Sequence, residues 1–146
     1  MAFALLKSVW ESGNLIFRRR DTLAGVVTLS PQGMRKWIAN TDYDTQNATI
    51  LAAAIVGGLI THTSNTGAGT VTVDTGAHLY AAVPGIQVGE AIECIFINDG
   101  DQTDTLAVAA GITFADVGQT VAINESAVLI FLCTAADTFV MYTVGA

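Results

Sequence analysis

Two histidines and one glycine-containing loop are the first places to look for chemistry in this sequence. His62 and His78 are its only histidines, and neither lies in a G-x-S-x-G, H-E-x-x-H or Cys/His spacing that would mark a nucleophile or a zinc site. Gly67-Ala68-Gly69 lacks the following lysine and the strand-to-helix context of a phosphate-binding loop. We therefore interpret both histidines as structural or solvated. We expect no catalytic, cofactor or metal site and no enzymatic activity.

The densest polar segment is residues 98–104, which reads Asn-Asp-Gly-Asp-Gln-Thr-Asp. Oxygen ligands at alternating positions around a glycine suit Ca²⁺, but an EF-hand loop that began at Asp99 would need a glutamate where Ala110 stands. Asp-Gly is also a strong signal for a tight turn between antiparallel strands. The segment predicts a solvated hairpin tip, with a cation site as the alternative.

Arg18-Arg19-Arg20 admits three interpretations. In the first, the three arginines lie on an edge strand, where their charges discourage aggregation. An arm that binds nucleic acid is the second, although about four net charges would give a log-log salt slope of only about −3 to −4. The third is docking on an acidic protein surface, because interfaces favour aromatic and arginine side chains. On this interpretation the candidate docking residues are Lys7, Trp10, Phe17, Arg18, Arg19, Arg20, Arg35, Lys36 and Trp37.

Charge is divided along the chain. All six basic residues lie in the first 36 positions, beside two acidic ones, so this segment carries +4. The remainder has eleven acidic residues and no Lys or Arg, a formal charge of −11. The asymmetry predicts a basic N-terminal arm, residues 1–44, and an acidic β-rich body, residues 45–146, with different partners. An acidic body repels nucleic acid.

The composition favours an assembly over a monomer. Hydrophobic residues make up 51% and charged residues 13% of 146 residues, against roughly 25% charged residues in a typical soluble domain. A monomer would expose an unusual amount of apolar surface. Cys94 and Cys133 lie in apolar runs and are interpreted as buried thiols, with a disulfide as the alternative. The apolar stretch at residues 48–60 is too short to span a bilayer, so we expect a soluble protein made in the cytoplasm.

Short strands about ten residues apart predict an all-β fold, a β-sandwich or jelly-roll-like barrel with one or two short helices and an extended N-terminal arm. Two stretches in the arm look strand-like, but they are too few to form a sheet alone, so we expect the arm to dock elsewhere. The expected helices are residues 46–55, capped by Asp44 or Thr45 and ended by Gly57-Gly58, and 79–83. The expected strands are residues 15–20, 26–29, 59–63, 70–74, 91–98, 105–109, 111–114, 120–124, 127–133 and 138–144.

Small-residue and turn patterns in the second part of the chain are similar to those of a known family. They lie at residues 57–61, 80–85 with 88–90, 96–98, 106–112 and 121–144. On these patterns the chain from about Thr45 to the C-terminus resembles the head decoration, or capsid cement, proteins of tailed bacteriophages. The first 44 residues match no pattern that we identify.

The resemblance implies a β-rich body, commonly trimeric, that sits on the outside of the icosahedral head and clamps adjacent capsid subunits. We therefore predict a homotrimeric virion protein whose partners are its own copies and the major capsid protein, with no membrane or nucleic acid partner. The nine docking residues become candidate capsid-binding residues. The same type of body is shared among virion parts, so a fibre or tail-associated protein that binds host glycans is the alternative.

Overall fold

The computed structural model describes residues 38–145, apart from residues 65, 117 and 118, together with three strands in the first 37 residues. By its backbone contacts the chain divides into two units, Met1–Trp37 and Ile38–Ala146, called here the N-terminal unit and the C-terminal unit. The sequence placed this division at residue 44. The difference arises because strand β4 (Ala39–Tyr43) pairs with a strand of the C-terminal unit.

The N-terminal unit contains a three-stranded antiparallel sheet in the order β1-β2-β3. Its strands are β1 (Lys7–Glu11), β2 (Asn14–Arg18) and β3 (Val27–Leu29). The sequence predicted the second and third of these but not the first. The expectation that this region has too few strands for a sheet is therefore wrong, because β1 supplies the third strand that the pattern did not reveal.

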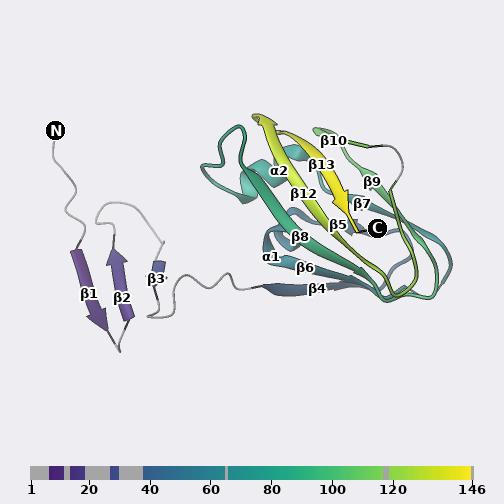
Figure 1. Ribbon diagram of the computed structural model, residues 1–146, viewed down its shortest axis with the longest axis horizontal. Coiled ribbons are helices and arrows are strands. Elements are labelled where there is room, and N and C mark those ends of the chain that lie inside the picture. Colours follow the sequence, from purple (N-terminus) through teal and green to yellow (C-terminus); the bar gives the residue numbers. More distant parts are fainter. Residues whose placement is uncertain are drawn as a thin grey trace. The chain divides into compact units, whose positions relative to one another are not determined.

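The C-terminal unit is mostly β, with two mixed sheets and two short helices (Figure 1). The six-stranded sheet has the order β10-β13-β12-β8-β6-β4 and the four-stranded sheet the order β11-β9-β7-β5. Besides β4, the first sheet comprises β6 (Gly58–His62), β8 (Ala91–Asn98), β10 (Ile112–Phe114), β12 (Ser126–Ala135) and β13 (Thr138–Val144). The second comprises β5 (Thr49–Ile50), β7 (Gly69–Val73), β9 (Asp104–Val108) and β11 (Thr120–Val121).

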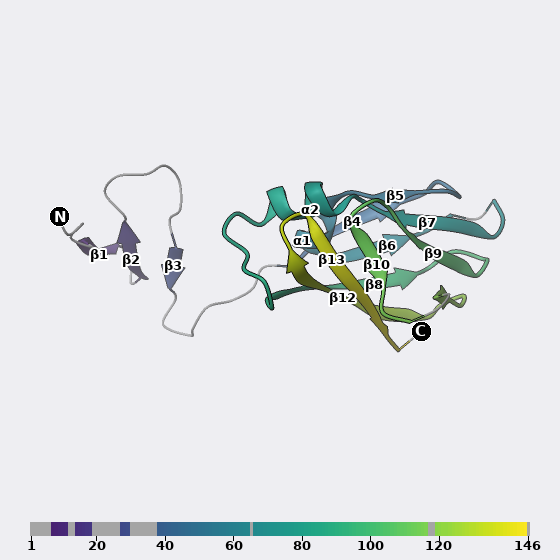
Figure 2. The ribbon, with the colours of Figure 1, turned by 90° about the horizontal axis from the view of Figure 1, so that it is seen from above.

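The chain alternates between the two sheets from β4 to β12. Strands β4, β6 and β8 are neighbours and parallel in one sheet, and β5, β7 and β9 are neighbours and parallel in the other. Helices α1 (Ala52–Gly57) and α2 (Gly76–Ala82) make the crossings from β5 to β6 and from β7 to β8. Both helices lie at the same end of the unit (Figures 1 and 2).

Helix α1 begins later than the sequence predicted. Thr49 and Ile50 pair in parallel with Thr72 and Val73, which draws these residues into the four-stranded sheet. The helix therefore starts at Ala52, not near residue 46. Its end agrees with the prediction, because Gly58 takes the left-handed conformation (φ 91°) that glycine adopts without a steric penalty.

The predicted hairpin across residues 98–104 is wrong. Strand β8 ends at Asn98 in the six-stranded sheet, while β9 begins at Asp104 in the four-stranded sheet, where it runs parallel to β7. The strands predicted at residues 127–133 and 138–144 are confirmed as β12 and β13, which are antiparallel neighbours. The Asp-Gly segment thus crosses between sheets, whereas the Ala135–Thr138 turn stays within one.

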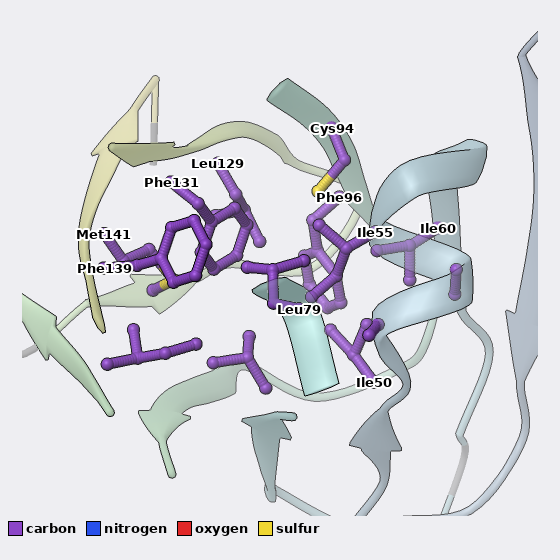
Figure 3. Close-up of a cluster of buried hydrophobic side chains, with 14 of the residues drawn as sticks. Ile50, Ile55, Ile60, Leu79, Cys94, Phe96, Leu129, Phe131, Phe139 and Met141 are labelled. Carbon is purple, nitrogen blue, oxygen red and sulfur yellow. The ribbon is translucent and has the colours of Figure 1, made fainter. Parts of the chain in front are cut away.

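One cluster of buried apolar side chains receives residues from both sheets and both helices. On β7 apolar and polar residues alternate, and Val71 and Val73 are fully buried. Phe96, Phe131 and Phe139 come from neighbouring strands of the six-stranded sheet, and Figure 3 shows their side chains converging with those of the helices. No helix among the described residues is long and apolar enough to cross a membrane.

Candidate functional site

The nine candidate docking residues all belong to the N-terminal unit. Lys7 and Trp10 lie on β1, and Phe17 and Arg18 lie on β2. The register pairs Lys7 with Arg18, so two basic residues stand opposite each other across the hairpin. Five of the nine lie outside the described residues: Arg19, Arg20, Arg35, Lys36 and Trp37.

A buried histidine and aspartate form a short polar contact in the C-terminal unit. His62 ends β6 and Asp104 begins β9, so one residue comes from each sheet. His62 Nδ1 lies 2.7 Å from Asp104 Oδ2, and Nε2 lies 2.9 Å from the carbonyl oxygen of Thr45. The two residues are 1% and 2% exposed. Phe96 stacks on the imidazole with ring centroids 6.4 Å apart.

The hydrogen bonds fix how protons are arranged in this pair. The Thr45 carbonyl can only accept, so His62 Nε2 carries a hydrogen and donates it. One further proton lies between Nδ1 and Asp104 Oδ2, on either the ring or the carboxyl group. Burial raises the pKa of Asp104, and the hydrogen bond and charge of His62 oppose that rise. In either arrangement the pair is neutral overall, which lowers the cost of burying it.

Because both ring nitrogens are engaged, this pair is unsuited to catalysis. A general base needs a free nitrogen within reach of a reacting proton, and His62 spends its second nitrogen on the backbone of Thr45. Ser64 is buried nearby in sequence, but its hydroxyl contacts Thr66 Oγ1 at 3.1 Å. The arrangement instead ties β6, β9 and the segment after β4 together at one end of the unit.

Asn98 organises the loop that the sequence identified as a hairpin tip or cation site. Its side chain is buried and donates to the carbonyl oxygens of Gln102 (2.7 Å) and Val121 (2.9 Å). Its Oδ1 accepts from the Gly100 N–H at 3.0 Å. A Cβ atom on Gly100 would lie 2.5 Å from the Ser64 carbonyl oxygen, so glycine is required there. Asp104 turns inward to His62, so it is not a solvated turn residue.

A second His–Asp pair lies on the surface, directly after the end of β7. His78 Nδ1 is 2.7 Å from Asp74 Oδ1, and the imidazole is exposed. Asp74 also accepts from the backbone N–H groups of Ala52 (3.0 Å) and Thr75 (2.8 Å). Burial opposes ionisation of Asp74 most strongly, but these bonds and His78 together hold its pKa below the ordinary value. Asp74 therefore caps α1 and supports the start of α2.

Neither pair extends to a metal site or a disulfide. The described residues contain no group of three or more His, Cys, Asp or Glu side chains placed to hold a metal ion. Cys94 pairs in register with Leu129, four residues from Cys133 along β12. That offset corresponds to about 13 Å, well beyond disulfide reach. Both cysteines are buried, as the apolar runs predicted.

Local sequence patterns did not reveal the outward side of the six-stranded sheet. Strands β8 and β12 are apolar at nearly every position, AIECIFIN and SAVLIFLCTA. Such runs are typical of strands that are covered on both faces. That signal was present in the sequence, but the residues involved become known only once the register is known.

The comparisons with known proteins leave the family open. No model of a known protein family matches the chain, and neither a curated protein nor a solved structure matches it. The likeness to head decoration proteins therefore remains a prediction from residue patterns.

Proposed function

We propose that this chain is a virion structural protein, a capsid decoration or cement protein that binds the outer surface of the assembled head as a homotrimer and stabilises it. The observation that carries the proposal is the separation into two units of opposite charge. Every Lys and Arg of the chain lies in the N-terminal unit, which has its own sheet, while the C-terminal unit has a separate core.

The N-terminal unit supplies the attachment element of this proposal. A basic segment with aromatic residues suits an acidic or apolar protein surface. At physiological salt the screening length is about 8 Å, so the charges act by contact more than at a distance. Three such units on one trimer would multiply a weak contact through their effective concentration. The partner in this proposal is the major capsid protein.

The C-terminal unit supplies the rigid part. Two mixed sheets that share one core fit the predicted sandwich architecture better than a closed barrel, because each sheet keeps two edge strands. A cement protein needs no turnover, since it stabilises a shell by binding the assembled state in preference to free subunits. A non-enzymatic role agrees with a His62 ring whose two nitrogens are both engaged.

Electron cryomicroscopy of purified particles that contain this chain tests the placement. We expect trimeric density on the outer surface of the head, contacted through the N-terminal unit. Density confined to the tail or fibres would favour the alternative of a fibre or tail-associated protein. Absence from the particle would refute both placements.

Charge reversal tests the attachment element. Replacing Arg18, Arg19 and Arg20 with Glu in the full chain is expected to abolish binding to heads that lack the protein, measured by co-sedimentation. The matched control is Glu125→Lys, which reverses an exposed charge of the C-terminal unit and should leave binding unchanged. Equal occupancy by the triple variant would refute the assignment of the attachment element.

A further inference from the structure

The outward side of the six-stranded sheet carries a continuous apolar face. Residues that alternate with the core residues of β8, β12 and β13 point away from the core. Most of them are also aliphatic or aromatic, and the one charged residue among them is Glu93. Tyr142 and Val144 are 40% and 56% exposed, and the others are half-buried by their neighbours in the sheet. This outward apolar face consists of Leu59, Ile95, Ile97, Val128, Ile130, Leu132, Val140, Tyr142 and Val144.

The strand register makes these residues one patch. One row crosses four strands, from Val144 through Val128 and Ile95 to Leu59. A parallel row holds Tyr142 opposite Ile130. Cross-strand neighbours on one face have Cβ atoms about 5 Å apart, so their side chains contact one another.

Polar residues border the patch. On the β4 side, Asp42 accepts hydrogen bonds from the hydroxyls of Thr61 (2.8 Å) and Thr63 (3.1 Å), and Asn40 joins the same network. Thr113 on β10 pairs with Val140 at the opposite edge. Apolar patches with a polar border mark interaction sites more often than ordinary surface. Glu93 stands opposite Ile130 within the sheet and is the charged residue nearest the centre of the described face.

The outward side of the other sheet shows what an ordinary exposed face of this protein looks like. There the positions that alternate with buried residues are mostly threonines, with one alanine. They are Thr49, Thr70, Thr72, Thr105, Ala107 and Thr120. The four-stranded sheet therefore has polar β-forming residues on its outward side, whereas the six-stranded sheet has mostly apolar residues there.

The size of the outward side suits a stable protein contact. Strands about 4.8 Å apart with alternate residues about 6.7 Å apart give the apolar face roughly 300 Å² and the whole outward side, border included, roughly 600 Å². Covering it with an equal area of a partner would bury about 1,200 Å² in total, the lower end of the range for specific stable interfaces.

We propose that the outward apolar face is covered by a second copy of this chain. The occupant must present apolar, weakly charged surface. The C-terminal unit has eleven acidic and no basic residues, so nucleic acid and anionic membranes are repelled. A second copy of this unit meets that requirement, because its own outward face has nine apolar residues around one acidic residue, Glu93. This face would form the contact between copies in the homotrimer, so the number of copies rests on the proposed function.

The test compares the molar mass of full-length variants in sedimentation at micromolar concentration. Ile130→Lys places a charge at the centre of the face, at a half-buried position opposite Glu93. We expect its dissociation constant to rise at least about 30-fold, as for central interface residues. The matched control is Thr105→Lys, at an outward position of the four-stranded sheet, which should leave the oligomer intact.

A monomeric wild-type chain would overturn the proposal and would indicate that the chain's own N-terminal unit or a foreign protein covers the face. Unchanged association of Ile130→Lys would also overturn it. Should that variant fail to fold by circular dichroism, Val144→Lys at the exposed end of β13 decides between the same outcomes. Loss of the oligomer in Ile130→Lys, together with a wild-type oligomer that does not bind heads, would refute the cement function and leave this inference standing. Head binding by a monomeric wild-type chain would refute this inference and the trimeric state, and would leave the attachment to heads standing.

Discussion

The two His–Asp pairs share one geometry and differ in everything around it. Both have Nδ1 and a carboxylate oxygen 2.7 Å apart. The His62–Asp104 side chains are 2% and 3% exposed and join two sheets, whereas the His78 side chain is 70% exposed and lies four residues from Asp74. A distance by itself therefore says little about energy, because burial and the other partners of each group decide what its loss would cost.

The two pairs differ in which residues the stability of the fold depends on. In the buried pair neither member can be removed without leaving the other polar group in the core. In the surface pair the carboxylate matters for the backbone N–H groups of Ala52 and Thr75, and His78 adds little. Four measurements test whether burial and the other partners, more than the distance, decide the cost of losing each pair.

The largest effect is expected for His62→Ala. It leaves the Asp104 carboxyl buried without its partner and removes the donor to the Thr45 carbonyl. We expect the free energy of unfolding to fall by about 3–5 kcal/mol in urea titrations. A fall below about 1 kcal/mol would show that water replaces the imidazole and that the pair is not a structural tie.

Asp74→Ala is expected to cost less, about 1–2 kcal/mol, because it removes an N-terminal cap of α1 and the acceptor for Thr75 N–H. The measurement is again urea unfolding. Asp74→Asn serves as the control, since its amide oxygen can still accept one of these bonds, and its loss should be smaller. Equal losses for the two variants would mean that charge, and not the hydrogen bonds, matters at this position.

The pH dependence of stability should have opposite signs for the two carboxyl groups. The depressed pKa of Asp74 gives stability that is present above its ordinary pKa of 3.8 and lost as the pH falls through the folded value. The raised pKa of Asp104 gives stability that is present below 3.8 and lost as the pH rises through the folded value. Urea midpoints of wild type, Asp74→Asn and Asp104→Asn from about pH 3 to about pH 7 separate the two contributions. Slopes of the same sign in both differences would contradict this assignment.

The smallest effect is expected for His78→Ala. An exposed i, i+4 pair contributes up to about 0.5 kcal/mol, and the backbone bonds to Asp74 remain when the imidazole is removed. Thermal unfolding should shift by little more than experimental error. A loss as large as that of His62→Ala would remove the distinction between the two pairs.

Local sequence patterns correctly predicted those strands that are defined by their own residues and by the turns beside them. The bounds of β8 and β13 agree with the prediction, and the turn before β12 contains Asn124 in the left-handed conformation that asparagine tolerates. These elements depend on short-range chemistry, namely alternation, β-branched residues and turn residues. Such information is complete within a window of about ten residues.

The failed prediction at residues 98–104 has a non-local cause. Asp-Gly favours a tight turn, but Asn98 binds the backbone at Val121, and Gly100 packs against the Ser64 carbonyl. Both partners are distant in sequence, so no local pattern contains them. The same holds for His62 and Asp104, which are 42 positions apart. One signal was available: Ile60 and His62 alternate on β6 and share its buried side.

The alternation of the chain between the two sheets has a consequence for how the protein is made. Among the described strands of the C-terminal unit, β12 and β13 form the one pair that is adjacent in sequence. Every other pairing closes a longer loop, which slows folding because chain entropy is lost before contacts form. Since β12 contacts β8 and β13 contacts β10, the six-stranded sheet cannot be completed until β13 has left the ribosome. Among the strands of this sheet, β12 and β13 are therefore the last to be synthesised and the last that can pair.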